Sequence, residues 1–367
     1  MLRSSVAILI LTGLNLAAMT QAVPAAAAGL KIALVAPTQG PFALLGKQML
    51  DGALFQAQDR GSEIVPINET CEASDGTALA KAVVAAGAEA VIGFLCTESL
   101  EAVLPALAES AIPAISLSVR SDILMEDALR KTWPFFRLVP SAKAESAKIT
   151  DVILSRWKDE PLALIDDGTI HGRELVESVR EALAGIGLTP VFNDTYRPAQ
   201  EQQVALVRRL AKSGATHVFI GGDRSDTAII ARDARSESIA LTLMGGEALS
   251  ATDQPVPLEN GVLAVTLPDY ASLPEAGPVG DAMKAAGLVA EGYVLPAFAA
   301  VSVLEQAKDQ AAKDNAGLLD GLAKGPYPTV LGPIRFDKEH ELADNPYRLM
   351  QWQNGRFVPV PSAQPAN

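Results

Sequence analysis

"EAVIGFLCTESLEAVLPALAESAIPAISL", residues 89–117, contains two apolar runs separated by a longer helical pattern. Residues 89–95 are an apolar run that predicts a buried strand, and residues 112–117 predict another. Residues 98–110 between them predict a helix. Both predicted strands are apolar throughout, as expected when helices cover both faces of a parallel sheet. The stretch therefore predicts a strand, a helix and a strand of an α/β fold.

The same alternation continues on both sides of this stretch. Residues 30–117 contain a series of short apolar runs separated by longer helical patterns. A second series of similar size covers residues 160–246, and the two are joined around residues 135–146. We therefore predict two doubly wound α/β lobes.

The C-terminal part of the chain is expected to complete these lobes. Residues 260–268 predict a strand, residues 291–313 a long apolar helix, and Asn354-Gly355 a two-residue hairpin. One helix and scattered strands do not make a third core, so the chain is expected to cross between the lobes more than once. A multi-stranded hinge would join the predicted lobes, which are residues 29–140 with 268–345, and residues 141–267 with 346–362.

The N-terminus has the pattern of a secretory signal peptide. Arg3 is a positive n-region, residues 6–18 are an apolar h-region, and Ala26-x-Ala28 is a cleavage site before Gly29. A transmembrane anchor is the alternative, but the apolar run is short and interrupted by polar residues. We expect export to the periplasm with cleavage between Ala28 and Gly29. No cysteine near the cut suggests a lipid anchor.

Length and charge limit the kind of partner. About 339 of the 367 residues remain after cleavage, which exceeds one ordinary core and favours two domains. The formal net charge is −13, which argues against nucleic acid and anionic lipid as partners. No second apolar stretch of the sequence reaches membrane length, so we expect the mature chain to be soluble.

The chain has two cysteines, Cys71 and Cys96. In an exported protein a disulfide is the simplest interpretation, and it would close a loop of 25 positions. Two cysteines alone do not build a structural zinc site. A nucleophilic Cys96 is the alternative, and it would require a base such as His171, His217 or His340.

Catalytic motifs are scarce in the sequence. It contains no G-x-S-x-G elbow, no P-loop, no H-E-x-x-H and no G-x-G-x-x-G after a predicted strand. The glycines of residues 168–172 are most simply an ordinary loop between strand and helix. Asp166 and Asp167 end a predicted strand, where a metal site is one interpretation and a solvated turn the simpler one. We expect no enzyme activity, no metal and no cofactor.

Polar side chains gather instead where predicted strands end. In open α/β sheets, ligands bind outside the carboxyl ends of the strands, next to helix N-termini. These corners are rich in hydroxyls, glycines and isolated charges, which suit a zwitterion. Two lobes that face each other with such corners would close on a small polar molecule. The corners are residues 35–41, 94–99, 115–121, 166–172, 220–226 and 244–250.

An ordered set of segments carries a family resemblance. The segments are KIALVAPTQGPFALLGKQMLDGA, VIGFLCTES, ALIDDGTIHGRELVESV, THVFIGG, LMGGE, GVLAVTLP and TVLGPIRFD. In this order they resemble the leucine/isoleucine/valine-binding protein family, the type I periplasmic solute-binding proteins that feed ABC importers. The resemblance covers the whole mature chain. It implies that fold, a Cys71–Cys96 disulfide, a monomer that binds an amino acid or similar solute, and a membrane permease with its ATPase as partner.

The resemblance also implies roles for individual residues. Thr97, directly after the second cysteine, would bind the α-carboxylate of the ligand through its hydroxyl. The corner from Ser116 to Ser118 would lie near the same carboxylate. Glu247 would hold the α-ammonium, and Tyr293 would line the pocket.

Four positions depart from the family pattern. Arg120 replaces a threonine that helps with the carboxylate, His171 replaces a tyrosine, and Asp223 and Leu45 each replace an aromatic residue. These changes predict a more polar pocket. A polar amino acid, an amide and another small carboxylate therefore fit comparably well as ligands.

Three classes of function follow from these observations. The first is a substrate-binding protein of an ABC importer, which captures a small amino acid or amino-acid-like solute between the lobes. The second is the sensing subunit of a receptor with the same fold. The third is a secreted hydrolase that uses Cys96 or the metal interpretation of Asp166 and Asp167.

Overall fold

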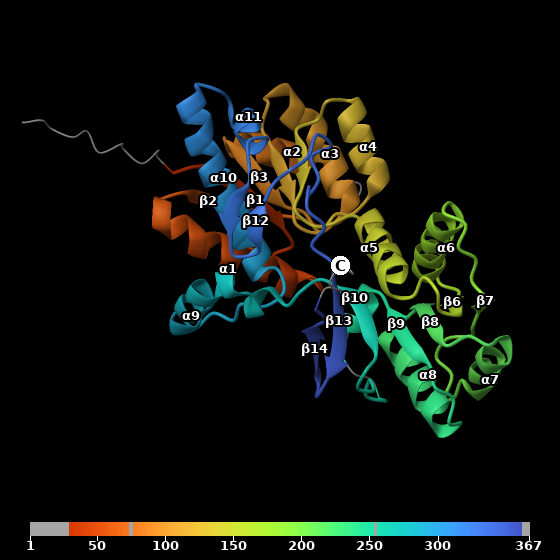
Figure 1. Ribbon diagram of the computed structural model, residues 1–367. Helices are drawn as coiled ribbons and strands as arrows, with labels where there is room; N and C mark the ends of the chain where they lie inside the picture. The colour runs from red at the N-terminus through yellow and green to blue at the C-terminus, as the bar shows by residue number, and fades with distance from the viewer. Residues whose placement is uncertain (1–28, 73–75, 253–254, 362–367) are drawn as a thin grey trace, which may run out of the picture.

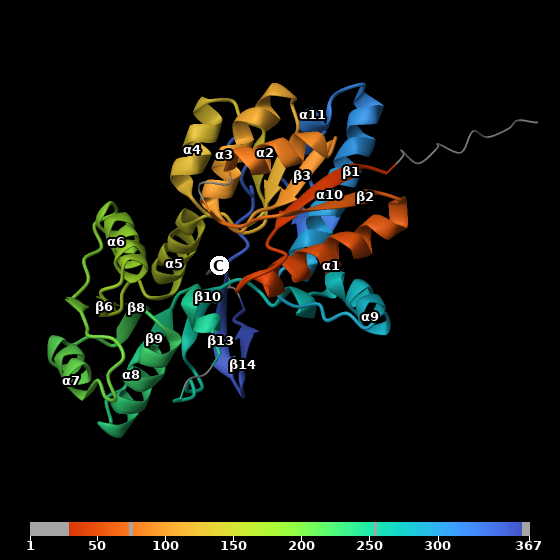
Figure 2. The same cartoon turned by 180° about the vertical axis from the view of Figure 1, so that it is seen from behind.

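The two predicted series of strands form two separate sheets, each at the centre of one lobe. The computed structural model describes residues 29–72, 76–252 and 255–361, so the predicted signal segment lies outside the described residues. Figure 1 shows one lobe above the other, and Figure 2 shows the same two lobes from behind. The prediction of two doubly wound α/β lobes is confirmed.

The first sheet is parallel throughout, in the order β2-β1-β3-β4-β5. Helices α1 and α10 pack on one of its faces, and α2, α3 and α4 pack on the other. The strands are β1 (Lys31–Ala36), β2 (Glu63–Asn68), β3 (Ala90–Gly93), β4 (Ala114–Ser116) and β5 (Phe135–Arg137). The helices are α1 (Ala43–Arg60), α2 (Gly76–Ala85), α3 (Thr97–Glu109), α4 (Asp122–Arg130) and α10 (Val294–Asp314).

The second sheet has the order β14-β13-β10-β9-β8-β6-β7, with β13 and β14 antiparallel to their neighbours. Helices α5 and α6 cover one face, and α7 and α8 cover the other. The strands are β6 (Leu162–Asp166), β7 (Phe192–Thr195), β8 (His217–Gly221), β9 (Thr242–Gly245), β10 (Leu263–Thr266), β13 (Arg348–Gln353) and β14 (Arg356–Pro359). The helices are α5 (Ala142–Arg156), α6 (Ile170–Ala184), α7 (Val204–Ser213) and α8 (Arg224–Ser236).

The chain passes between the sheets three times. It leaves β5 for α5, returns after β10 towards α10, and leaves again to form β13. The second passage carries α9 (Gly277–Ala285), and the third follows α11 (Leu318–Leu322), β11 (Tyr327–Thr329) and β12 (Gly332–Ile334). The predicted hairpin is confirmed, because Asn354 and Gly355 both have positive φ between β13 and β14. The loops that follow the strands of the two sheets therefore lie close together beside these three passages.

The region around residues 118–146 differs from the prediction in detail. Residues 135–146 were expected only to join the lobes, but Phe135–Arg137 is a buried strand and α4 precedes it. Three residues are too short a run to display a periodicity, and only pairing with β4 makes this segment a strand. Among the residues that the structure describes, no helix has both the length and the apolar character needed to cross a membrane.

Candidate functional site

A cavity of about 270 Å³ lies where corners of the two lobes meet. The loops after β4 and β5, with Tyr270 and the start of α10, line it from the first lobe, and Glu247 after β9 and Leu267 after β10 line it from the second. Hollows beside α1, α8 and α10 are each lined by one lobe only. A more open hollow of about 500 Å³ is lined by α5 and α6 of the second lobe, with Glu145 and His171, and by Asp122 of the first. The lining residues are Leu117, Ser118, Arg120, Leu138, Val139, Pro140, Glu247, Leu267, Tyr270, Gly292, Tyr293, Pro296 and Leu331. This position agrees with the rule that α/β sheets bind ligands at the carboxyl ends of their strands.

Arg120 and Glu247 form an ion pair from opposite sides of this cavity. Arg120 follows β4 of the first sheet, and Glu247 follows β9 of the second, at the start of the short helix η2 (Glu247–Ser250). Arg120 Nη1 donates to Glu247 Oε2 at 2.6 Å, and Nη2 donates to Oε1 at 3.0 Å. Burial alone would lower the pKa of the Arg120 guanidinium, but its bonds with Glu247 raise that pKa above its ordinary value.

Tyr347 is the third member of this group. Its side chain is fully buried, and it lies on the third passage between the lobes, just before β13. Its hydroxyl donates to Glu247 Oε2 at 2.6 Å and accepts from Arg120 Nη1 at 2.9 Å. Burial raises the pKa of the phenol, and so does the negative charge of Glu247. The hydroxyl therefore stays protonated and remains a donor to Glu247.

Glu145, at the start of α5, holds Glu247 from behind. Only 2% of Glu145 is exposed, and its Oε1 accepts the backbone N–H of Glu247 at 2.7 Å. Burial raises the pKa of Glu145, and the neighbouring charge of Glu247 adds to this increase. Burial would also raise the pKa of Glu247, but the hydrogen bond and charge of Arg120 lower it overall. The two carboxyls therefore have pKa values that are displaced in opposite directions.

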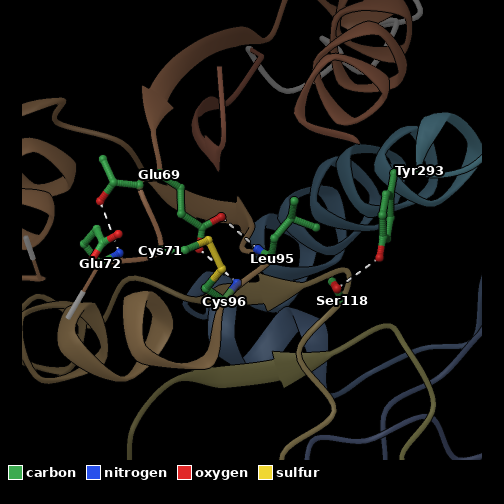
Figure 3. Close-up of a disulfide and its surroundings, with 8 residues drawn as sticks. Glu69, Cys71, Glu72, Leu95, Cys96, Ser118 and Tyr293 are labelled. Carbon is green, nitrogen blue, oxygen red and sulfur yellow. Dashed lines mark hydrogen bonds between the residues drawn. A yellow bond between two sulfur atoms is a disulfide. The ribbon is translucent and has the colours of Figure 1, made fainter. Parts of the chain in front are cut away.

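Ser118 and Tyr293 meet at the wall of the cavity. The Tyr293 hydroxyl donates to Ser118 Oγ at 3.0 Å, and Figure 3 shows the two side chains pointing toward each other. Ser116 is fully buried, and its Oγ accepts the backbone N–H of Val119 at 2.9 Å. Ser116 thus holds the loop after β4 in shape, whereas Ser118 and Tyr293 line the cavity itself.

Thr97 lies at a neighbouring corner, as the first residue of α3, and it is half-buried. It is not among the residues that line the cavity. The corner is held by Glu69, which accepts the backbone N–H groups of Leu95 at 2.8 Å and Cys96 at 3.1 Å (Figure 3). Gly93 precedes it with φ at 113°, where a side chain would also collide with the carbonyl oxygen of Val35.

The Cys71–Cys96 disulfide is present, which confirms that prediction. It joins the loop after β2 to the start of α3, as Figure 3 shows. Among the described residues, one group of carboxylate and sulfur atoms lies close enough to hold a metal, and it is Glu69 with these two cysteines. Because the two sulfurs are bonded to each other, they are not thiolate ligands. The alternative interpretation of Cys96 as a nucleophile is wrong, because its sulfur is bonded to Cys71 and is not a free thiol.

His171 and Asp223 do not line the cavity. His171 is exposed at the start of α6, and its positive form lowers the pKa of Glu145 and of Glu247. Asp223 is exposed at the start of α8, where its charge raises the pKa of Asp226 and of Tyr196. The structure thus brings Ser118, Arg120, Glu247 and Tyr293 together. Ser116 is buried in the same corner as Ser118 without lining the cavity, and Thr97, His171 and Asp223 lie at neighbouring corners.

Three residues of the site were not predicted from the sequence. Glu145 and Tyr347 contact Glu247, and Tyr270 lines the cavity. Tyr347 begins a segment that the sequence predicts to be extended, and nothing in that pattern gives it a role in a site. Glu145 looks like an ordinary acidic residue in the first turn of a helix, a favourable position in any helix. No signal in the local sequence separates these residues from surface positions, because their role depends on segments far away in the chain.

Comparison with known proteins places the chain in a family. Residues 29–356 match the family model described as periplasmic binding protein. The Leu/Ile/Val-binding protein homolog 3 of Brucella melitensis is 25% identical over 349 residues, which are 91% of this chain and 94% of that protein.

Solved structures agree with this assignment at the level of the fold. The structure of a candidate branched-chain amino acid ABC transporter from Rhodospirillum rubrum has a TM-score of 0.78 and 18% identity, covering 90% of this chain and 100% of that one. A solute-binding protein of R. palustris in complex with 4-hydroxybenzoate has a TM-score of 0.65 and 16% identity, covering 90% and 95%. The chain therefore belongs to the periplasmic binding protein family, as a relative of the Leu/Ile/Val-binding proteins, and is a binding protein rather than an enzyme.

Proposed function

We propose that this protein is the substrate-binding protein of an ABC importer and that it captures a small carboxylate-bearing solute, an amino acid or a related acid, between its lobes. The observation that carries the proposal is the cavity of about 270 Å³, which both lobes line. Small-molecule sites of this kind are concave and mostly apolar, with a few convergent polar groups. Here the polar groups are Ser118, Arg120, Glu247, Tyr270 and Tyr293.

The solute would be captured by closure of one lobe against the other. The moving bodies are residues 29–140 with 268–345, and residues 141–267 with 346–362. The packing of α10 against the first sheet and the pairing of β13 with β10 support this division. The three passages between the sheets would act as the hinge. The closed form would then be recognised by a membrane permease and its ATPase.

We propose that the solute contacts residues in the loops at the carboxyl ends of the strands. Ser118 and Arg120 would hold the carboxylate at the cavity wall, with Tyr293 behind them. Thr97 would contribute its hydroxyl from the start of α3, and Ser116 would hold the neighbouring loop. His171 and Asp223 would lie at the rim and act through their charges.

Export is part of this proposal. Cleavage after Ala28 would release a chain that begins at Gly29, where the match to the family model also begins. We expect the mature chain to be a monomer in the periplasm. Sequencing the N-terminus of the protein recovered from a periplasmic extract tests the cleavage site, and gel filtration tests the oligomeric state.

The solute itself can be recovered from the protein. Protein from a periplasmic extract would be unfolded gently, and the small molecules released would be identified by mass spectrometry. Thermal unfolding of the stripped protein would then be measured with a panel of amino acids and small carboxylic acids. A released acid that raises the melting temperature supports the proposal. The absence of any released acid, together with no shift across the panel, would count against it.

A further inference from the structure

We infer that the solute is a carboxylic acid with an apolar body and no α-ammonium group, and that Arg120 is the residue that determines this specificity. The inference rests on the proposed function, because it names the class of solute that the cavity takes. It starts from the ion pair between Arg120 and Glu247, which occupies the position where the family resemblance implies a ligand ammonium.

Glu247 has little capacity left for an ammonium group. Its Oε1 accepts from Arg120, and its Oε2 accepts from both Arg120 and Tyr347. A ligand ammonium would have to displace a guanidinium that is bonded through two nitrogens, which is a strong arrangement. It would also approach the positive charge of Arg120 in a half-buried site, where like charges repel more strongly than in water.

Glu145 does not replace Glu247 as a partner for an ammonium. It is only 2% exposed, and it faces the hollow beside α5 and α6 rather than this cavity. Its Oε1 is used by the backbone N–H of Glu247. A solute inside the cavity therefore meets one acidic side chain, Glu247, whose charge Arg120 already balances.

Arg120 keeps one edge available for a carboxylate. A guanidinium has five N–H donors arranged on two edges. The outer edge, formed by Nη1 and Nη2, faces Glu247, and Nη1 also donates to Tyr347. Within the described part of the chain, no hydrogen bond uses the Nε–H, which forms the second edge with the remaining N–H of Nη2. The Arg120 side chain is 33% exposed, so a ligand can reach this edge.

Ser118 adds a donor on the same loop. Its Oγ accepts from the Tyr293 hydroxyl, so its own hydrogen is directed elsewhere. Arg120 and Ser118 both line the cavity and lie two positions apart. Together they present the N–H and O–H donors that a carboxylate prefers.

The remaining wall of the cavity suits an apolar body. Five leucines and valines and two prolines face it, whereas its other polar side chains are the two tyrosines. Burial raises the pKa of Tyr270 to about 12, so this phenol is neutral at physiological pH. The apolar residues are Leu117, Leu138, Val139, Pro140, Leu267, Pro296 and Leu331. An aliphatic or aromatic side of the solute would be buried against them.

Matched pairs of probes test the inference directly. Calorimetric titration of the stripped full-length mature protein would compare L-leucine with 4-methylpentanoate, and L-phenylalanine with 3-phenylpropanoate. Each pair differs only in the ammonium group. We expect the deaminated acid to bind more tightly, by roughly tenfold or more. Tighter binding of the amino acids would overturn the inference but would leave the proposed function standing. Binding of neither class would overturn both.

Two variants distinguish a Glu247 that is occupied by Arg120 from a Glu247 that binds a ligand ammonium. Glu247→Gln leaves the charge of Arg120 uncompensated, so we expect it to keep or raise the affinity for 4-methylpentanoate. Loss of acid binding in this variant would contradict the inference. Arg120→Thr removes the donor edge and frees Glu247, so acid affinity should fall by roughly tenfold or more and L-leucine should gain affinity. Unchanged acid binding in Arg120→Thr would overturn the inference.

A surface ion pair provides the matched control. Arg208 and Glu237 form a two-bonded pair on the second lobe, at 2.7 and 3.1 Å, away from the cavity. Glu237→Gln removes the same charge without touching the cavity, and acid affinity should not change. Thermal unfolding of all three variants separates a loss of binding from a loss of fold.

Discussion

Arg120 and Glu247 are 127 positions apart in the sequence and lie on different lobes, yet they share two hydrogen bonds at 2.6 and 3.0 Å. Their side chains are 33% and 27% exposed, so the pair is neither a surface contact nor a fully buried one. It links the lobes in this conformation and also balances the charge inside the cavity. Removal of either partner would leave the other unpaired in a half-buried position, which is costly.

Tyr347→Phe should lower the free energy of unfolding. The Tyr347 hydroxyl bonds both Arg120 and Glu247, so its removal deletes two bonds to charged groups. We expect a loss of about 1–3 kcal/mol at neutral pH, measured by urea denaturation. Tyr270→Phe is the matched control, because within the described residues burial and nearby charges act on the Tyr270 hydroxyl but no hydrogen bond does. If the two changes lowered the free energy of unfolding equally, the hydrogen bonds of the Tyr347 hydroxyl would contribute nothing to stability.

Thr97→Ala should weaken binding of the solute. The Thr97 hydroxyl is proposed to donate to the ligand carboxylate from the start of α3, where the helix N-terminus also favours an anion. We expect a loss of about 1–3 kcal/mol in binding free energy, measured by calorimetric titration. Thr97→Ser keeps a hydroxyl and should retain most of the affinity. Identical affinities for the alanine variant and the parent would remove Thr97 from the site.

Loss of the disulfide should destabilise the first lobe. Cys71 and Cys96 are 25 positions apart, and in the chain-entropy model closing a loop of this length contributes roughly 3–4 kcal/mol. In the double variant Cys71→Ser with Cys96→Ser, the free energy of unfolding should fall by about this amount, measured by urea denaturation. Thiol titration of the denatured, unreduced protein should find no free thiol. Two titratable thiols in exported protein would contradict the prediction.

Glu145→Gln should stabilise the protein at neutral pH. Burial raises the pKa of Glu145 above its ordinary value of 4.5, so the folded state holds this proton to a higher pH than the unfolded state. The contribution of Glu145 to stability is therefore greatest below pH 4.5 and falls as pH rises through the folded pKa. The amide variant lacks this loss, and its oxygen can still accept the N–H of Glu247.

Unfolding free energies of Glu145→Gln and its parent at pH 4 and pH 7 check this prediction. The advantage of the variant should be small at pH 4 and larger at pH 7. Glu98→Gln, at an exposed position in the first turn of α3, controls for the loss of one negative charge. An advantage that is larger at pH 4 would reverse the assigned direction.

Much of the fold follows from local patterns. The apolar runs at residues 30–36 and 89–95 became β1 and β3, and the helical segment between residues 291 and 313 became α10. These elements were predictable because a strand or helix buried on its inner face shows its period in the chain itself. The short strand β5 was missed, since three residues show no period.

The candidate site was only partly predictable. Ser118, Glu247 and Tyr293 were named from the resemblance, and the structure places all three at one cavity. Glu145 and Tyr347 were missed because each looks ordinary among its sequence neighbours. Their significance lies in hydrogen bonds to Glu247 that span 102 and 100 positions.

Two α/β lobes, the corners where polar side chains gather and a bond between the two cysteines could all be predicted from the amino-acid sequence alone. The resemblance also marked Arg120 as a departure from the family pattern and Glu247 as a match to it. It did not show that the two side chains meet. That the Arg120 guanidinium lies on the Glu247 carboxylate and balances its charge became visible only in the folded chain. The reason is physical: periodic burial is a local property of the chain, whereas an ion pair depends on where two corners of separate lobes come to lie.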